Sequence, residues 1–233
     1  MAHTLYLVST PIGNLEDITL RALRILKEVS LILAEDTRHT RVLLAHYGIT
    51  TRCESYHDFN KERVGERYLR FLEEEGSIAL VSDAGTPSIS DPGFNLTRDA
   101  IAREIPVVPI PGASALLAAL VGSGLPTDQF FFGGFLPKKS AQRMRLFSSL
   151  RGRRGSQIFY VSPHQMEKVL DELCETLSGA TVVLARELTK KFEEYQRGTP
   201  EELRERWKEH PSKGEFVLLL DLKQLTPLTG EIS

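Results

Sequence analysis

Short apolar runs alternate along most of the chain with stretches in which apolar residues recur every three or four positions. The runs predict buried strands, and the spaced positions predict amphipathic helices. In the first half, strands are expected at 4–9, 31–34, 77–82 and 106–110. Helices are expected at 15–29 (capped by Asn14), 40–47, 62–75, 94–103 and 113–121. This alternation is typical of an α/β fold with largely parallel strands.

The alternation resumes after residues 122–126, where turn-forming residues cluster. Further strands are expected at 130–132, 156–161, 181–185, 191–196 and 215–220. Further helices are expected at 140–150, 165–177 and 200–210. We therefore expect an N-terminal α/β domain over 1–122, a C-terminal α/β domain over 123–225 and a tail over 226–233. Each domain should hold a mixed, mostly parallel sheet flanked by helices, and a cleft between two such domains is a common ligand site.

Composition narrows the class of protein. The chain has 233 residues, of which 41% are hydrophobic and 26% charged, as in an ordinary soluble globular protein. No apolar run reaches the roughly 18 residues of a membrane-spanning helix, and the N-terminus lacks the pattern of a signal peptide. Cys53 and Cys174 lie far apart, which favours reduced thiols. We expect a cytoplasmic protein that contacts no membrane.

Charge is unevenly distributed along the chain. The net charge is −2, yet residues 129–166 contain no acidic side chain. The basic residues here that are candidates for RNA binding are Lys138, Lys139, Arg143, Arg151, Arg153 and Arg154. A basic surface on an acidic body fits an anionic polymer, although a solvated helix and an exposed turn explain it equally well. Phe131 and Phe132 precede the lysines and could stack bases or belong to the core.

Four loops that follow expected strands are rich in small and polar residues. They span 9–14, 34–38, 82–93 and 110–115. Open α/β sheets bind ligands at the carboxyl ends of their strands. The first loop matches neither a dinucleotide fingerprint nor a P-loop, and turn geometry alone would explain its glycine. The third is longer than a connection requires, and its small side chains would let a ligand approach the backbone.

Two carboxylates and an arginine follow the second expected strand. Asp36 could take a proton, and Arg38 could orient it or grip a phosphate. A helix N-cap with a surface salt bridge is the alternative interpretation. The chain has no H-E-x-x-H, no Cys/His metal spacing and no G-x-S-x-G motif.

The chain resembles the tetrapyrrole methylase superfamily, also called class III methyltransferases, and within it the branch that acts on small-subunit ribosomal RNA. The segments that carry the resemblance are STPIGNLEDIT, AEDTR, SDAGTPSISDPG, PGASALLAAL, FFGGFLP and ARELTKKFEEYQRGT, in that order. The resemblance covers about residues 4 to 221. The resemblance implies a homodimer that binds S-adenosyl-L-methionine between its two domains and uses no metal. It implies 2′-O-methylation of a cytidine in the decoding region of 16S rRNA, within the 30S subunit.

The resemblance also assigns roles to single residues. The residues that we expect to contact the methyl donor are Pro11, Asp83, Ala84, Gly85, Thr86, Ile89, Ser114, Ala115, Val161 and Leu188. Thr86 stands where the superfamily usually has an aspartate that grips the ribose, and Asp83 is the candidate to replace it. A ribose hydroxyl is a weak nucleophile, so we expect Asp36, or Glu35 beside it, to act as base. Arg38 is expected to anchor the substrate.

Two other functions stay open at this point. A methyltransferase of the same fold would act on a tetrapyrrole, another small molecule or a protein side chain. The acid-free segment and the 34–38 loop favour RNA over such substrates. The second alternative is a non-catalytic RNA-binding assembly factor that retains a degenerate cofactor pocket.

Overall fold

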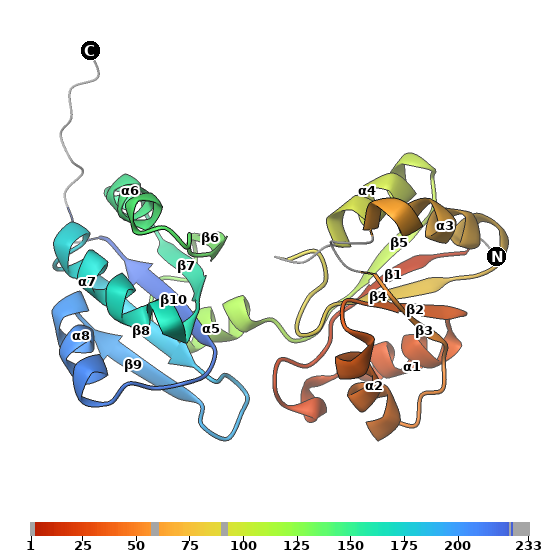
Figure 1. Ribbon diagram of the computed structural model, residues 1–233, viewed down its shortest axis with the longest axis horizontal. Coiled ribbons are helices and arrows are strands. Elements are labelled where there is room, and N and C mark those ends of the chain that lie inside the picture. The colour runs from red at the N-terminus through yellow and green to blue at the C-terminus, as the bar shows by residue number, and fades with distance from the viewer. Residues whose placement is uncertain (1–2, 57–60, 90–92, 224, 226–233) are drawn as a thin grey trace, which may run out of the picture. The chain divides into compact units, whose positions relative to one another are not determined.

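The structure is a computed structural model, and it describes residues 3–56, 61–89, 93–223 and 225. The chain divides into two compact units, Met1–Ser114 and Ala115–Ser233. The elements of each are labelled in Figure 1. The expected boundary at residue 122 falls inside helix α5 (Ala115–Ser123), which belongs to the second unit. The expected tail at 226–233 lies outside the described residues.

A five-stranded parallel sheet forms the centre of the first unit. Its strands are β1 (Leu5–Val8), β2 (Leu31–Ala34), β3 (Cys53–Ser55), β4 (Ile78–Val81) and β5 (Val107–Ile110), in the order β3-β2-β4-β1-β5. Every pair is parallel, as expected. Strands β2 and β4 are buried along their whole length, which explains their continuous apolar sequences. Strand β3 was not expected, because it has three residues and a half-polar sequence.

Helices cover both faces of this sheet, as Figure 1 shows. Helices α1 (Leu20–Glu28) and α2 (Thr37–His46) pack on one face, and α3 (Lys61–Glu74) and α4 (Gly93–Ala102) on the other. Side chains of one strand alternate between the two cores, so Leu31 and Leu33 face α3 and α4, whereas Ile32 faces α1.

The helix expected over 15–29 is interrupted. Asn14 caps only a short 3-10 turn, η1 (Leu15–Asp17), by accepting the Glu16 N–H. The α-helix begins after Thr19, whose hydroxyl oxygen accepts the Ala22 N–H at 3.1 Å. The true cap therefore lies five residues after the expected one, because Thr19 satisfies a free N–H group of the first helical turn.

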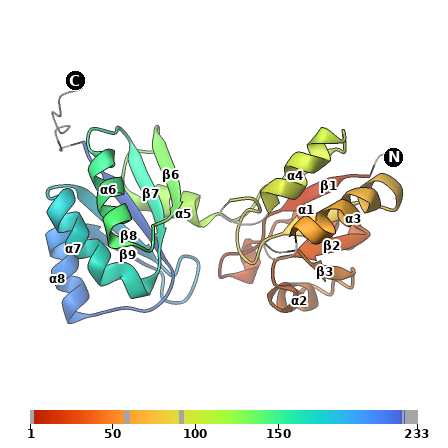
Figure 2. The same cartoon turned by 45° about the horizontal axis from the view of Figure 1, so that its top comes forward.

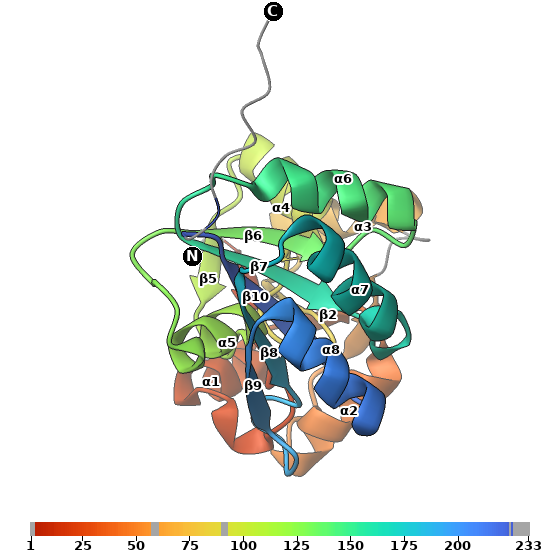
Figure 3. The ribbon, with the colours of Figure 1, turned by 90° about the vertical axis from the view of Figure 1, so that its left-hand side faces the viewer.

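The second unit contains another five-stranded sheet with different pairing. Its strands are β6 (Phe130–Phe135), β7 (Ser156–Val161), β8 (Thr181–Arg186), β9 (Glu194–Gly198) and β10 (Phe216–Asp221), in the order β6-β7-β10-β8-β9. Figure 3 shows this order across the sheet. Strands β6 and β7 are parallel, whereas the other three pairs are antiparallel. The expectation of mostly parallel pairing is therefore wrong for this sheet. Helix α6 supplies the crossover that a parallel pair needs, whereas β8 and β9 join through a loop alone.

The second sheet is also covered on both faces, as Figure 2 shows. Helices α6 (Ser140–Leu150), α7 (Met166–Thr176) and α8 (Pro200–Glu209) bury one apolar core, and the 3-10 turn η2 (Pro163–Gln165) leads into α7. Helix α5 packs against the other face.

The C-terminal part of α5 is held by strand β9. The Tyr195 hydroxyl donates to the Ala118 carbonyl at 2.9 Å, and Arg197 Nε donates to the Ser123 carbonyl at 2.9 Å. The Tyr195 ring occupies the space that a Cβ at position 122 would need. Gly122 therefore marks a close packing contact inside a helix.

Candidate functional site

Four loops of the first unit begin at one edge of its sheet, because the carboxyl ends of parallel strands lie together. They are residues 9–14 after β1, 35–36 after β2, 82–89 after β4 and 111–114 after β5. Strands β1 and β4 are neighbours, but the chain leads from β1 to β2 and from β4 to β5, on opposite sides. Such a reversal is the switch point at which open α/β sheets bind ligands.

Backbone hydrogen bonds join the loops after β1 and β4. The Thr10 N–H donates to the Gly85 carbonyl at 2.9 Å, and the Gly85 N–H donates to the Thr10 carbonyl at 3.0 Å. The Thr10 hydroxyl also donates to the Ser82 carbonyl at 3.2 Å. Gly85 has a φ of +84°, a left-handed conformation that favours glycine. The two loops are thus fastened at the switch point.

Thr86 connects these loops to the one after β5. Its hydroxyl oxygen lies 3.3 Å from the Ser9 hydroxyl, which donates to it, and it donates to the Ala113 carbonyl at 3.3 Å. Gly112 is packed so closely that an added Cβ would lie 2.9 Å from the Ser9 Cβ. An ionised aspartate could not donate to a carbonyl, so threonine suits position 86 in this chain.

Asp83 joins the loops after β4 and β2. Its Oδ1 accepts the backbone N–H of Asp36 at 2.9 Å. One of its carboxylate oxygens therefore positions the start of helix α2. The expectation that Asp83 grips a ribose stays a prediction.

Asp36 is the N-cap of α2 and is paired with Arg38. Its Oδ1 accepts the Arg38 backbone N–H at 2.8 Å, and the guanidinium donates to both carboxylate oxygens at 3.2 and 2.8 Å. The Arg38 side chain, followed by its backbone N–H, lowers the pKa of Asp36 to about 2. These contacts are those of the alternative interpretation, a cap with a salt bridge. A carboxylate with so low a pKa is a weak base, so base catalysis requires Arg38 to move away.

Exposure differs among the other residues predicted at this edge. The Arg38 side chain is 87% exposed, which leaves it accessible to a large substrate. Pro11 is buried, whereas Ala84 and Ile89 are exposed. Glu35, Ser114 and Ala115 are half-buried, and Ala115 already belongs to α5 in the second unit. The structure therefore brings the first-unit candidates to one sheet edge without testing their roles.

Two further donor contacts predicted in the second unit, Val161 and Leu188, are buried. Val161 ends β7 and packs in the core beneath α6 and α7. Leu188 follows β8 between Glu187 and Thr189, whose φ values are +48° and +66°. The Thr189 hydroxyl oxygen is buried and has no hydrogen-bond partner within the described part of the chain. An unsatisfied buried hydroxyl of this kind is suited to a polar group of a ligand.

The structure separates the basic candidates into two groups. Lys138, Lys139, Arg153 and Arg154 are exposed. Arg143 is only 1% exposed, which contradicts the expectation that it contacts RNA. Its guanidinium donates to Glu172 and to two backbone carbonyls, so a phosphate would have to displace these partners.

Arg151 also has a structural role. It is half-buried and donates to the Thr176 carbonyl from Nε at 2.9 Å and from a terminal nitrogen at 2.7 Å. Thr176 is the last residue of α7, where cations and donors satisfy free carbonyls. A role of Arg151 in RNA binding stays a prediction, but its loss would also disturb this helix end.

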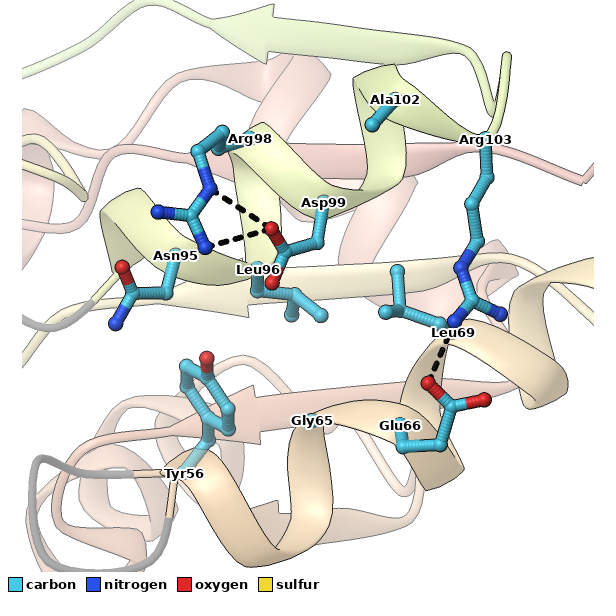
Figure 4. Close-up of a pocket in the computed structure, with 10 residues that line it drawn as sticks. All are labelled: Tyr56, Gly65, Glu66, Leu69, Asn95, Leu96, Arg98, Asp99, Ala102 and Arg103. Atoms are coloured by element: carbon cyan, nitrogen blue, oxygen red, sulfur yellow. Dashed lines mark hydrogen bonds and ion pairs between the residues drawn. The ribbon is translucent and has the colours of Figure 1, made fainter.

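A separate cavity of about 640 Å³ lies between α3 and α4 of the first unit (Figure 4). Its lining residues are Tyr56, Gly65, Glu66, Leu69, Asn95, Leu96, Arg98, Asp99, Ala102 and Arg103. None is among the predicted site residues. Arg98 pairs with Asp99 at 2.7 Å and Arg103 with Glu66 at 2.5 Å. Sequence reasoning missed this cavity, since charges on two amphipathic helices are ordinarily solvated.

No described helix is both long and apolar enough to cross a bilayer. Within the described ranges, no three His, Cys, Asp or Glu side chains are grouped so that they could hold a metal ion. The expectation that the protein uses no metal stays a prediction.

Comparison with known proteins gives a consistent family. The model of the tetrapyrrole (corrin/porphyrin) methylases matches residues 4–204. A ribosomal RNA small subunit methyltransferase I of Halalkalibacterium halodurans is 50% identical over 218 residues, which are 94% of this chain and 75% of that protein. The protein of the same name from Bacillus subtilis is 45% identical over 217 residues, 93% of this chain and 74% of its own length.

Solved structures share the fold at lower identity. A diphthine synthase superposes with a TM-score of 0.72 at 15% identity, covering 95% of this chain and 91% of its own. A uroporphyrin-III C-methyltransferase from Thermus thermophilus, complexed with S-adenosyl homocysteine, has a TM-score of 0.63 at 20% identity and covers 94% and 97%. At these identities the likeness concerns the fold alone.

Proposed function

Because this chain belongs to the tetrapyrrole methylase family, we propose that it transfers a methyl group from S-adenosyl-L-methionine to small-subunit ribosomal RNA. The observation that carries the proposal is the 44–50% identity, over most of the chain, to relatives named ribosomal RNA small subunit methyltransferase I. In detail, we propose 2′-O-methylation of a cytidine in the decoding region of 16S rRNA, within the 30S subunit. The proposed enzyme is a cytoplasmic homodimer that needs no metal.

The fastened loops at the switch point fit a bound methyl donor. Gly85 and Gly112 leave the backbone without side chains where the loops meet, and Thr86 fixes their spacing. In the second unit, Leu188 is a proposed donor contact, and the buried hydroxyl of Thr189 beside it has no hydrogen-bond partner among the described residues. These residues would bind and orient S-adenosyl-L-methionine, whose sulfonium supplies a methyl group that a nucleophile can attack directly.

The chain must then activate and align a ribose hydroxyl. Holding the hydroxyl in line with the methyl group lowers the activation barrier. In well-oriented intramolecular reactions this effect reaches about 7 kcal/mol or more. We propose Asp36 as the base and Arg38 as the phosphate anchor. When Arg38 turns to a phosphate of the RNA, Asp36 loses the partner that lowers its pKa and becomes a stronger base. Substrate binding would thereby switch on the base.

Methyl transfer from tritium-labelled S-adenosyl-L-methionine tests this function. We expect incorporation into 30S subunits, with naked 16S rRNA, a porphyrinogen and a protein extract as parallel acceptors. The labelled linkage should resist alkaline hydrolysis, since a methylated 2′ oxygen cannot attack the adjacent phosphate. Incorporation into the porphyrinogen or the protein extract alone would contradict the proposal. Absence of donor binding in calorimetry would favour the non-catalytic assembly factor.

A further inference from the structure

Strand β6 lies at one edge of the second sheet and carries three exposed phenylalanines. Phe130, Phe131 and Phe135 are 46%, 39% and 65% exposed. We name these three residues the β6 aromatic surface. Single exposed apolar side chains are ordinary, but several large rings on one short strand mark an interaction site.

A glycine bulge determines where Phe135 lies. The register between β6 and β7 shifts between Phe132 and Phe135, across Gly133 and Gly134. Gly134 has a φ of +68°, and a Cβ at Gly133 would overlap a buried phenylalanine ring of β7. Both positions therefore require glycine, and bulges of this kind redirect a side chain.

The bulge places Phe132 and Phe135 against the same tyrosine. Their ring centroids lie 5.0 and 5.2 Å from that of Tyr160, in edge-to-face geometry. Phe135 is thus supported from within the sheet while most of its surface faces solvent. An aromatic ring that is both held and exposed loses little conformational freedom when a planar group stacks on it.

A cation accompanies Phe131, which lies on the opposite face of the sheet from Phe135, because the two rings contact Phe159 and Tyr160, which are consecutive residues of β7. The Arg153 guanidinium carbon lies 4.9 Å from the centroid of Phe131, whose ring also contacts the buried Phe159. Lys138 and Lys139 follow Phe135 within four residues and are exposed. The surface therefore combines rings with positive charge, in a segment that contains no acidic residue from 129 to 166.

We propose that the β6 aromatic surface binds unpaired nucleotides of the RNA substrate. A single strand that passes over this edge of the sheet would stack bases on Phe135 on one face and on Phe131 on the other, and its phosphates would approach Lys138, Lys139 and Arg153. The exposed cations that follow and flank these rings favour a polyanion over a protein partner. Paired RNA cannot use this surface, because its base faces are stacked inside the helix. The inference rests on the proposed function, since it assigns the contacts of the same substrate.

Variants at position 135 separate stacking from simple apolar contact. We expect Phe135→Ala and Phe135→Leu to weaken affinity for a fluorescent single-stranded RNA about tenfold, within the range for loss of one stacked base. Phe135→Trp should retain affinity, and its fluorescence should be quenched when RNA binds. Equal affinity of the Leu variant and the wild type would overturn the stacking role.

Phe192 supplies a matched control. Its side chain is 63% exposed and has Lys191 Nζ 5.6 Å from the ring centroid, but it lies in the loop between β8 and β9. Phe192→Ala should bind the RNA as wild type does, and a blunt duplex should bind all variants equally. An equal loss in the Phe192 variant would overturn the assignment to β6.

Salt dependence and self-association complete the test. Phe135→Ala should leave the slope of log affinity against log salt concentration unchanged. Lys139→Ala should reduce this slope by about one, because one fewer counterion is released when RNA binds. If Phe135→Ala abolishes self-association but keeps RNA affinity, the surface belongs to a second copy and the inference fails. If wild type methylates 30S subunits while both Phe131→Ala and Phe135→Ala bind RNA normally, this inference fails and the proposed function stands. If wild type neither binds nor methylates RNA, both fail.

Discussion

The Arg143 guanidinium donates to both carboxylate oxygens of Glu172, at 2.7 and 2.6 Å, inside the second unit. Its remaining contacts go to the carbonyls of Pro137 and Lys138, each at 2.9 Å. One buried side chain thus joins α6 to α7 and holds the segment that leads from β6 to the exposed lysines. Arg143 therefore positions this segment.

Breaking this buried pair should destabilise the protein strongly. We expect Arg143→Ala to lose about 3–5 kcal/mol in urea unfolding, because it leaves the Glu172 carboxylate buried without its partner. Arg24→Ala is the control, since Arg24 and Glu28 form an exposed pair that contributes at most about 1 kcal/mol. An Arg143→Met/Glu172→Leu double variant should recover much of the loss. Equal effects of the two Ala variants would contradict the buried role.

The pKa of Asp36 should depend on Arg38. We expect Arg38→Ala to raise it from about 2 toward its ordinary value, because the first cause of the shift is the Arg38 side chain. A lowered pKa stabilises the fold above the unfolded value near 4, and this contribution disappears as the pH falls through about 2. Carboxyl carbon chemical shifts measured against pH by NMR would show the change. An unaltered titration in the variant would rule out the pairing in solution.

The role of Asp36 as base can be separated from its role as cap. Asp36→Asn retains an N-cap oxygen but cannot take the proton, so turnover should fall about 100-fold or more while donor affinity stays near wild type. Single-turnover methylation and calorimetry measure the two quantities. Glu35→Gln is the matched control for the neighbouring carboxylate. A normal rate in the Asp36 variant together with a slow Glu35 variant would assign the base to Glu35.

Alanine variants at two glycines with left-handed backbone can separate an effect on donor binding from an effect on stability. Gly85 and Gly48 have φ values of +84° and +61°, and Gly48 follows helix α2 with open space around it. Alanine at either position should reduce stability by about 1 kcal/mol. Only Gly85→Ala should weaken the affinity for S-adenosyl-L-methionine, about tenfold or roughly 1.4 kcal/mol. The reason is that the added methyl group fills space beside the joined loops. Similar donor affinities of the two variants would argue against a donor site here.

Charge reversal should reveal the phosphate contacts. Arg153→Glu with Arg154→Glu should weaken RNA binding and lower the salt dependence by about two ions. Arg21→Glu with Lys27→Glu carries the same charge change on exposed positions of α1 and should have little effect. Arg151 is left unchanged, because it caps α7. Filter binding over a salt series measures the slope of log affinity against log salt concentration for each variant. A slope of the Arg153/Arg154 variant equal to that of wild type would reject this basic surface.

Local patterns were sufficient for most of the elements. Strands β2 and β4 are buried on both faces, so their apolar runs predicted them directly. Strand β3 escaped detection, because a short polar segment becomes a strand only by pairing with β2. The second sheet shows the same limit, since β10 lies antiparallel between β7 and β8 although nothing in its own residues states its direction.

The residues alone were enough to locate the strand ends with their small-residue loops, and hence the edge at which ligands are expected. Periodicity and turn chemistry act over a few residues, so they can be seen without a structure. The packing of the folded chain was needed to show that Asp83 meets Asp36, which lies 47 positions away, and that Arg143 is buried against Glu172. Burial and partner choice depend on how distant segments pack. The residue type alone does not show whether an arginine binds a phosphate or a buried carboxylate.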